Sequence, residues 1–132
     1  MGISDEEKIR RIEALLRALN TGEYDAALEL SHPDIALIRP GGAGELRGRE
    51  QLRGWMEPDA FESQVTEILG SEVEGKRVLA RVRSRARGRG SGIEIDISAW
   101  TVYTFDDEGR FTRVEIYLEH EEAEARRALN AA

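Results

Sequence analysis

The feature that most constrains the fold is a pair of alternating segments, 78–87 and 93–105, joined by a glycine-rich run. They read VLARVRSRAR and IEIDISAWTVYTF, and in both of them two kinds of side chain alternate. A period of two is typical of β-strands that have one face in a core and the other face outside it. The glycines between the segments permit the positive φ angles of a tight turn. We therefore predict one long β-hairpin over residues 78–105.

Charge predicts the register of this hairpin. A shift of one residue would exchange the two faces of a strand, so only registers that match polar with polar side chains are acceptable. One such register also brings an arginine over the indole of Trp100. Its expected pairs are Arg87–Glu94, Arg85–Asp96, Arg83–Ser98, Arg81–Trp100, Val82–Ala99 and Ala80–Thr101. The hairpin then has a mostly apolar face and a face of arginines and acids.

Composition limits the class of protein. A chain of 132 residues with 34 % charged residues is typical of one globular domain, residues 1–132. The net charge of −7 argues against a nucleic acid or an anionic membrane as the main partner, in spite of the arginine-rich ribbon. There is no cysteine, the first residues are polar, and no apolar run is long enough for a membrane span. We expect a cytoplasmic protein, and the excess of arginine over lysine favours a bacterial source.

The rest of the chain predicts helices packed on a sheet. Ser4 is the expected N-cap of the first helix, in a capping box with Glu7, and Gly22 follows the end of that helix. Pro33 is expected to end the second helix. The predicted helices are 5–19, 24–30, 49–56 and 119–129, and the predicted strands besides the hairpin are 35–39, 61–73 and 111–118. This order favours an α+β fold with helices on one face of a curved sheet.

Three short motifs resemble the SnoaL-like branch of the nuclear transport factor 2-like superfamily. They are N-x-G-[DE]-x-D at 20–25, G-R-E-x-[LI]-R at 48–53, and an acidic turn with glycine at 106–109. The resemblance covers nearly the whole chain. It implies a cystatin-like cone, in which a curved mixed or antiparallel sheet wraps around the N-terminal helix with three further helices. It also implies a pocket for a small, largely apolar molecule, and a homodimer.

Ketosteroid isomerase-related members of this superfamily use a general-base Asp, with a Tyr and a protonated Asp that donate to the enolate oxygen. The resemblance aligns the base with Arg39, the Tyr with Leu15 and the protonated Asp with Thr101, and a further pocket Tyr with Met56. Arginine stays protonated at neutral pH and cannot act as the base. We therefore expect no isomerisation by that mechanism.

The last predicted strand identifies the concave face of the sheet. Its apolar residues alternate with Arg113, Glu115 and Tyr117, and we expect Ile116 beside Ala99 and Val114 beside Thr101. An apolar lining with a few hydroxyl groups is typical of a small-molecule site. The residues expected to line the pocket are Leu15, Leu19, Arg39, Trp55, Met56, Val82, Ser84, Ile97, Ala99, Thr101, Tyr103, Val114, Ile116 and Leu118.

The convex face carries aromatic and arginine side chains, which are enriched at protein interfaces. We predict that this face forms a homodimer, with Trp100 near the centre of the interface. The residues expected in the interface are Arg81, Arg83, Trp100, Val102, Glu115 and Tyr117. The alternative is a solvated face on which the arginines shield the indole.

Three functions remain open. The first is binding of an apolar or amphipathic small molecule in the cone. The second is an enzyme of the same fold, of the polyketide cyclase, isomerase or lyase type, with Arg39, Tyr103 or His32 as the candidate catalytic residue. The third is a structural dimerisation module with a filled cone. We expect no cofactor and no metal, since His32 and His120 have no partner ligands at metal-binding spacing.

Arg39 also has two interpretations. It can bind a carboxylate or an enolate at the mouth of the pocket. Alternatively it forms an ion pair with a neighbouring acid such as Glu45 or Glu62.

Overall fold

A computed structural model describes residues 2–56 and 61–131 of the chain. This part of the chain contains four α-helices and a single six-stranded sheet. The helices are α1 (Asp5–Thr21), α2 (Tyr24–Glu29), α3 (Arg49–Met56) and α4 (Glu122–Asn130). The strands are β1 (Ser31–Arg39), β2 (Gly44–Arg47), β3 (Phe61–Glu74), β4 (Arg77–Gly88), β5 (Glu94–Phe105) and β6 (Phe111–Leu118). Short 3₁₀ turns lie at Pro40–Gly42 and Glu119–Glu121.

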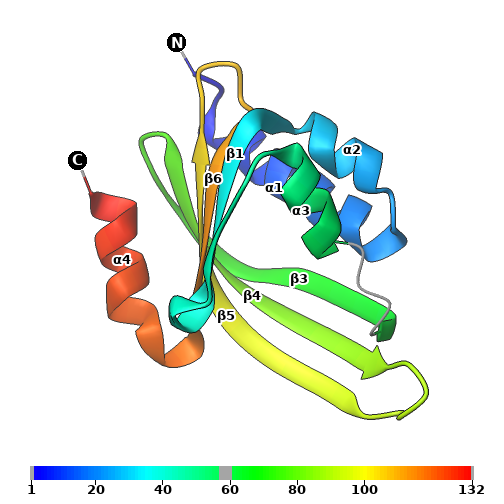
Figure 1. Cartoon of the computed structure of the whole chain (residues 1–132). Coiled ribbons are helices and arrows are strands. Elements are labelled where there is room, and N and C mark those ends of the chain that lie inside the picture. The colour runs from blue at the N-terminus through cyan, green and yellow to red at the C-terminus, as the bar shows by residue number, and fades with distance from the viewer. Residues whose placement is uncertain (1, 57–60, 132) are drawn as a thin grey trace.

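The strands follow the order β2-β1-β6-β5-β4-β3. Neighbouring strands are antiparallel except β1 and β6, which run parallel, so the sheet is mixed. Figure 1 shows α1, α2 and α3 on the inner side of the curved sheet and α4 on its outer side. This arrangement confirms the predicted α+β fold. The prediction that the helices lie on one face of the sheet is wrong for α4, which packs on the outer face against Leu79 and Val102.

The predicted hairpin register is confirmed at every expected pair, from Arg87–Glu94 to Ala80–Thr101. The predicted position of β6 is wrong by two residues, because Ile116 lies beside Thr101 and Leu118 beside Ala99. The turn before β6 pairs Phe105 with Phe111, and a β-bulge then adds one more residue. A shift of two residues leaves the faces unchanged, so the apolar residues of β6 still lie on the concave face.

Some element boundaries differ from the prediction. β1 begins at Ser31 and not at residue 35, so Pro33 lies within a strand rather than after a helix. The pairing of β1 with β6 is irregular between Ser31 and Ala36, which accommodates a proline without a ladder N–H. β2 was not predicted at all. Ser4 does cap α1, but the Glu7 carboxylate binds Arg10 at 2.8 Å instead of completing a capping box.

The core lies between α1 and the concave face of the sheet. Ile12 of α1 and Val78 of β4 are fully buried there. Tyr103, Phe105 and Phe111 form an aromatic group, in which the ring centres of Phe105 and Phe111 are 4.7 Å apart. These rings fill the end of the cone next to the turn before β6, which we call its narrow end. The opposite end, toward the hairpin turn between β4 and β5, is called the wide end.

The motif at 20–25 has a structural role at the edge of the sheet. The Asn20 side-chain amide donates to the Thr66 carbonyl at 2.9 Å, and its oxygen accepts from the Thr66 N–H at 2.8 Å. Thr66 belongs to β3, the edge strand, so Asn20 satisfies backbone groups that would otherwise have no strand partner. Gly22 then adopts a φ of 75° and ends the helix.

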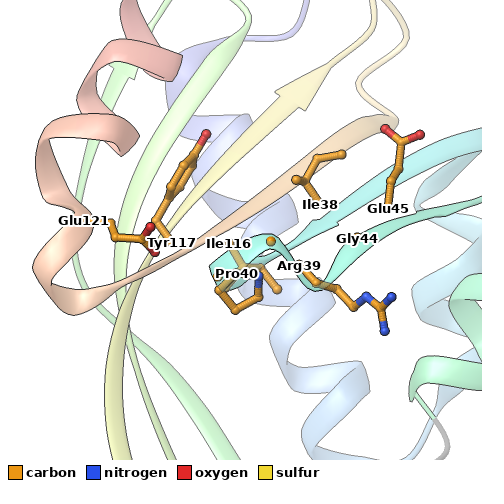
Figure 2. Close-up of a pocket in the computed structure, with 10 residues that line it drawn as sticks. Ile38, Arg39, Pro40, Gly44, Glu45, Ile116, Tyr117 and Glu121 are labelled. Carbon is orange, nitrogen blue, oxygen red and sulfur yellow. The ribbon is translucent and has the colours of Figure 1, made fainter.

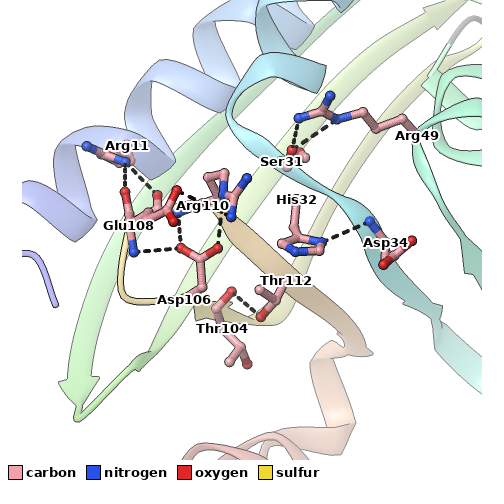
Figure 3. A network of polar contacts seen from close by, with 11 residues as sticks. Arg11, Ser31, His32, Asp34, Arg49, Thr104, Asp106, Glu108, Arg110 and Thr112 are labelled. Atoms are coloured by element: carbon pink, nitrogen blue, oxygen red, sulfur yellow. Dashed lines mark hydrogen bonds and ion pairs between the residues drawn. The ribbon is translucent and has the colours of Figure 1, made fainter. Parts of the chain in front are cut away.

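The other two motifs also take part in hydrogen bonds between a side chain and the backbone (Figure 3). The Arg49 guanidinium donates to the Ser31 carbonyl from Nε at 3.0 Å and from Nη2 at 2.5 Å. Nη1 of Arg11 donates to the Gly109 carbonyl at 2.7 Å, which ties α1 to the turn before β6. The motifs that carry the family resemblance therefore hold the fold together.

Asp106 organises that turn. Its carboxylate accepts hydrogen bonds from the N–H of Glu108 and of Arg110, both at 2.9 Å, and from the Arg110 guanidinium at 3.0 Å. Partial burial raises the pKa of Asp106, but the hydrogen bonds from Arg110 and Glu108 outweigh it, so the pKa lies below its ordinary value. The ionised carboxylate therefore stabilises the folded state.

We predict that Asp106→Asn lowers the free energy of unfolding by about 1.5 kcal/mol at neutral pH, because it weakens hydrogen bonds to a charged group. Since the folded pKa is depressed, this stabilisation is present above the unfolded pKa of about 4 and is lost as pH falls through the folded value. Urea unfolding from pH 7 down to about pH 3 measures the difference between variant and wild type, which should shrink below about pH 4.

Asp107→Asn is the matched control, because Asp107 lies in the same turn but is exposed and pairs with Lys76 at 2.7 Å. Its loss of stability should be smaller than that of Asp106→Asn. Equal losses for the two variants would contradict the assigned role of Asp106.

Candidate functional site

The concave face of the sheet is built from alternate residues of neighbouring strands. The observed register aligns Val82, Ala99 and Leu118 in one row, and Ala80, Thr101 and Ile116 in the row beneath it. Ser84 and Ile97 form the next row toward the wide end. The register therefore brings the predicted sheet residues of the pocket onto one surface.

Burial decreases along this surface from the narrow end of the cone to the wide end. Tyr103 and Thr101 are each 4 % exposed, whereas Leu118 is 40 % and Ile97 is 57 % exposed. The cone is therefore filled with side chains at its narrow end and presents exposed apolar side chains at its wide end.

The predicted pocket residues fall into two groups. Leu15, Met56, Val82, Tyr103 and Val114 lie in the core cluster, with Leu19, Ala99 and Ile116 packed against it. Trp55, Ile97 and Leu118 are exposed. Ser84 is half-buried, and its hydroxyl lies 2.9 Å from that of Thr66. The residues of the first group pack in the core or against it, and of these only Ile116 also lines the groove at the end of β1 among the described residues. That the others line a ligand pocket stays a prediction.

Sequence reasoning missed the contribution of β3 to this face. Thr66 pairs with Ser84 and Ile68 with Val82, so both lie on the concave side. A β-bulge between Ile68 and Gly70 interrupts the alternation of the strand. The sequence of 63–68, SQVTEI, has no period-two alternation that could have identified these residues, because its apolar residues Val65 and Ile68 lie on opposite faces of the strand.

Tyr103 is not placed to act as a base or nucleophile. Burial in the apolar core raises the pKa of its hydroxyl above the ordinary value, and a hydrogen bond with Thr101 only partly offsets this. The phenol is therefore neutral at physiological pH.

Arg39 lies at the end of β1, on the same face as the core residues Ile35 and Leu37. With Ile116 of the adjacent strand it lines an open groove of about 540 Å³, which curls around the glycine-rich turn after β1. Figure 2 shows the guanidinium extending to one side of the strand and the Tyr117 ring to the other.

The Arg39 guanidinium contacts backbone and not an acid. Its Nη2 donates to the Ala43 carbonyl at 2.5 Å. The expected ion pair with Glu45 is wrong, because Glu45 instead pairs with Arg47 at 2.9 Å. The side chain of Glu62, the other expected partner, lies outside the described residues. Arg39 forms no ion pair with any residue that the structure describes.

The histidines do not join this site. Nδ1 of His32 accepts the N–H of Asp34 at 3.0 Å near the start of β1, as Figure 3 shows, and His120 is exposed. Within the described ranges, no group of three or more His, Asp or Glu side chains is arranged to hold a metal ion.

On the concave face of the sheet, Arg39 is the only ionisable residue with a charge at neutral pH among those described.

Part of the convex face is covered by α4 of the same chain. Leu79 and Val102 form a second buried cluster with Ala125 and Leu129 of this helix. The Trp100 indole donates to the Glu119 carbonyl at 3.1 Å, with the guanidinium groups of Arg81 and Arg126 each 5.7 Å from its ring centre. The expectation that Val102 is available as an interface residue is therefore wrong, since α4 already buries it.

The arginines of the convex face are mostly paired with acids. Arg83 forms an ion pair with Asp96 at 2.6 Å. Arg85 is the register partner of Asp96, but its guanidinium lies 3.5 Å from the carboxylate of Glu67 instead. Arg81 binds Glu119 at 2.5 Å. These ion pairs lower the positive charge that the sequence suggests for the hairpin.

The profile of the SnoaL-like domain family matches residues 12–114. Because this match covers most of the chain, the protein belongs to the SnoaL-like family. The search among curated proteins found no match. In the described ranges, no helix has the length and apolar character needed to cross a membrane.

Many solved structures share the fold. A putative SnoaL-like polyketide cyclase from Jannaschia sp. CCS1 is 18 % identical with a TM-score of 0.77, over 100 % of this chain and 99 % of that chain. An LEH-like epoxide hydrolase from M. tuberculosis is 20 % identical with a TM-score of 0.74, over 94 % and 90 %. A further M. tuberculosis protein, solved with estradiol-17beta-hemisuccinate, is 12 % identical with a TM-score of 0.76, over 85 % and 93 %. At these identities the likeness shows the fold alone.

We predict that Tyr103→Phe leaves the near-ultraviolet absorbance titration of the folded protein unchanged up to about pH 11, because the buried Tyr103 hydroxyl does not ionise in that range. The measurement compares tyrosinate absorbance of the variant and the wild type as pH rises. A loss of ionisable phenol between about pH 7 and 10 in the variant would contradict this and would favour Tyr103 as a catalytic acid or base.

Proposed function

We propose that this protein binds a small apolar or amphipathic molecule at the open, wide end of its cone. The observation that carries the proposal is the exposure of Ile97 and Leu118 on a concave face, above a core that is otherwise closed. Concave surfaces that combine apolar side chains with a few polar groups are the usual form of small-molecule sites. Thr66, Ser84 and Arg39 supply the polar groups here.

The comparisons support this proposal at the level of the fold. One structural neighbour was solved with a steroid derivative, estradiol-17beta-hemisuccinate. Another is a computationally designed binder of 17-OHP. A cone of this shape is therefore compatible with an apolar ligand.

An enzymatic function is the second candidate, and it is favoured by neighbours that are an epoxide hydrolase and a putative polyketide cyclase. Such chemistry needs an acid or base at the ligand. Arg39 stays protonated, Tyr103 is buried and neutral, and His32 binds backbone away from the groove. Glu45 and Glu121 line the groove, but each of these carboxylates is bonded to another group, Glu45 to Arg47 and Glu121 to the N–H of Leu118. Binding without catalysis is therefore the better-supported function.

A filled-cone module is the third candidate. The packed narrow end favours it, but the exposed apolar residues of the wide end have no structural purpose under that interpretation.

A cytoplasmic location stays a prediction.

We predict that Ile97→Asp weakens binding of the neutral fluorescent probe N-phenyl-1-naphthylamine by about tenfold, because it removes apolar contact and places a charge in the site. Fluorescence titration of wild type and variant measures the dissociation constants. The thermal midpoint should change little, since Ile97 is exposed in the free protein.

Val65→Asp is the matched control. Val65 is 45 % exposed and pairs with Arg85, so it lies on the outer face of the sheet. The control should bind the probe as the wild type does. Wild-type protein that fails to bind the probe, or equal weakening by the two variants, would reject the proposed site.

We also predict a homodimer, formed by the part of the convex face that α4 leaves exposed, including Arg81, Arg83, Glu115 and Tyr117. Trp100, the expected centre of the interface, would lie at the margin of this area beside α4. Light scattering at micromolar concentration should give about twice the protomer mass of 14.8 kDa. A monomer mass would contradict the prediction without affecting the proposed ligand site.

A further inference from the structure

We infer that the ligand of the cone is an organic acid, and that Arg39 binds its acidic group. This inference rests on the proposed function and adds the chemical class of the ligand. It depends on where Arg39 lies, on which of its hydrogen-bond donors are free, and on what surrounds its charge.

The position of Arg39 follows from the strand register. Leu37 pairs with Val114 and Ile38 with Glu115 in the parallel ladder, so Arg39 lies beside Ile116. Two residues further along β6, Leu118 lies about 7 Å beyond Ile116 on the same face. A cation at the end of β1 is thus adjacent to the exposed apolar residues of the wide end.

The guanidinium of Arg39 is held in place but is not saturated. Of its five N–H donors, one is used in the hydrogen bond from Nη2 to the Ala43 carbonyl. The Nε atom is buried and has no hydrogen-bond partner. A buried donor without a partner is destabilising, so the described protein leaves the hydrogen-bonding capacity of this guanidinium incompletely used.

The turn after β1 is shaped around this side chain. Gly44 has a φ of 107°, and a Cβ at that position would lie only 3.2 Å from Nη2 of Arg39. Glycine therefore leaves room for the guanidinium against the turn and allows the Ala43 carbonyl to fix its orientation. A cation fixed in this way loses little conformational freedom when it binds an anion.

The acids near the groove are occupied elsewhere. Glu45 pairs with Arg47, and Oε1 of Glu121 accepts the N–H of Leu118 at 2.8 Å. Figure 2 shows Glu45 and Tyr117 extending from their strands on the other side from the Arg39 guanidinium. The positive charge of Arg39 therefore has no counter-ion among the described residues.

A cation with free donors beside an apolar surface matches an amphipathic anion. The carboxylate or sulfonate of such a ligand would accept hydrogen bonds from the free terminal N–H groups of Arg39, whose planar arrangement matches an oxyanion. The apolar body would lie over Ile116, Leu118 and Ile97.

The test uses two probes with the same aromatic body, 1-anilinonaphthalene-8-sulfonate and N-phenyl-1-naphthylamine, which differ only in the sulfonate. We expect Arg39→Gln to weaken binding of the sulfonate probe by about tenfold or more, and to leave binding of the neutral probe nearly unchanged. Fluorescence titrations at fixed ionic strength give the dissociation constants. Ile97→Asp should weaken both probes, which verifies that both occupy the cone.

Arg85→Gln is the matched control, because it removes the same charge from an ion pair with Glu67 on the outer face of the sheet, away from the groove. It should leave both probes unaffected. Arg39→Lys keeps the charge without the forked donors and should weaken the sulfonate probe less than Arg39→Gln does. This variant also serves if Arg39→Gln lowers the thermal midpoint so far that it cannot be titrated.

The outcomes separate this inference from the proposed function. If the wild type binds neither probe, the proposed function fails and the inference fails with it. If the wild type binds the neutral probe and Arg39→Gln does not change the affinity for the sulfonate, the proposed function stands and the inference is overturned.

Discussion

The structure depends on the burial of one side of α1 against the concave face of the sheet. Ile12, Val78 and Phe111 are fully excluded from solvent there, and each such side chain contributes about 1.5–3 kcal/mol. Hydrogen bonds fasten the helix at two points, through Arg11 to the turn before β6 and through Asn20 to the edge strand. The helix therefore sets the curvature of the sheet and the width of the cone.

This packing decides which part of the concave face remains for a ligand. The helix and the aromatic rings fill the narrow end, where Thr101 and Tyr103 are buried. The hairpin continues beyond the reach of α1, and its apolar side chains at Ile97 and the neighbouring Leu118 stay exposed. Because the hairpin is longer than the helix that covers it, an apolar surface stays open, and no particular residue type is needed to produce it.

The polar groups divide between the two faces of the sheet according to this packing. On the outer face, arginines pair with acids and with the Trp100 ring beneath α4, and these contacts serve the fold. On the inner face, Arg39 has a buried nitrogen without a partner. Arg39, which has no acidic partner among the described residues, is therefore the arginine that we propose binds the ligand, rather than the conspicuous row of arginines on the hairpin.

The sequence by itself determined the hairpin, its register and the faces of β5 and β6. Alternation of side chains assigns the faces, and a short turn limits which residues can pair, so that charge matching selects the register. It also identified the bounds of α3 and the family. Tertiary structure alone decided the two-residue shift of β6, the early start of β1, the cover of Trp100 by α4 and the closure of the narrow end. Bulges and packing between distant elements leave no local pattern, since their energy arises only once the chain has folded.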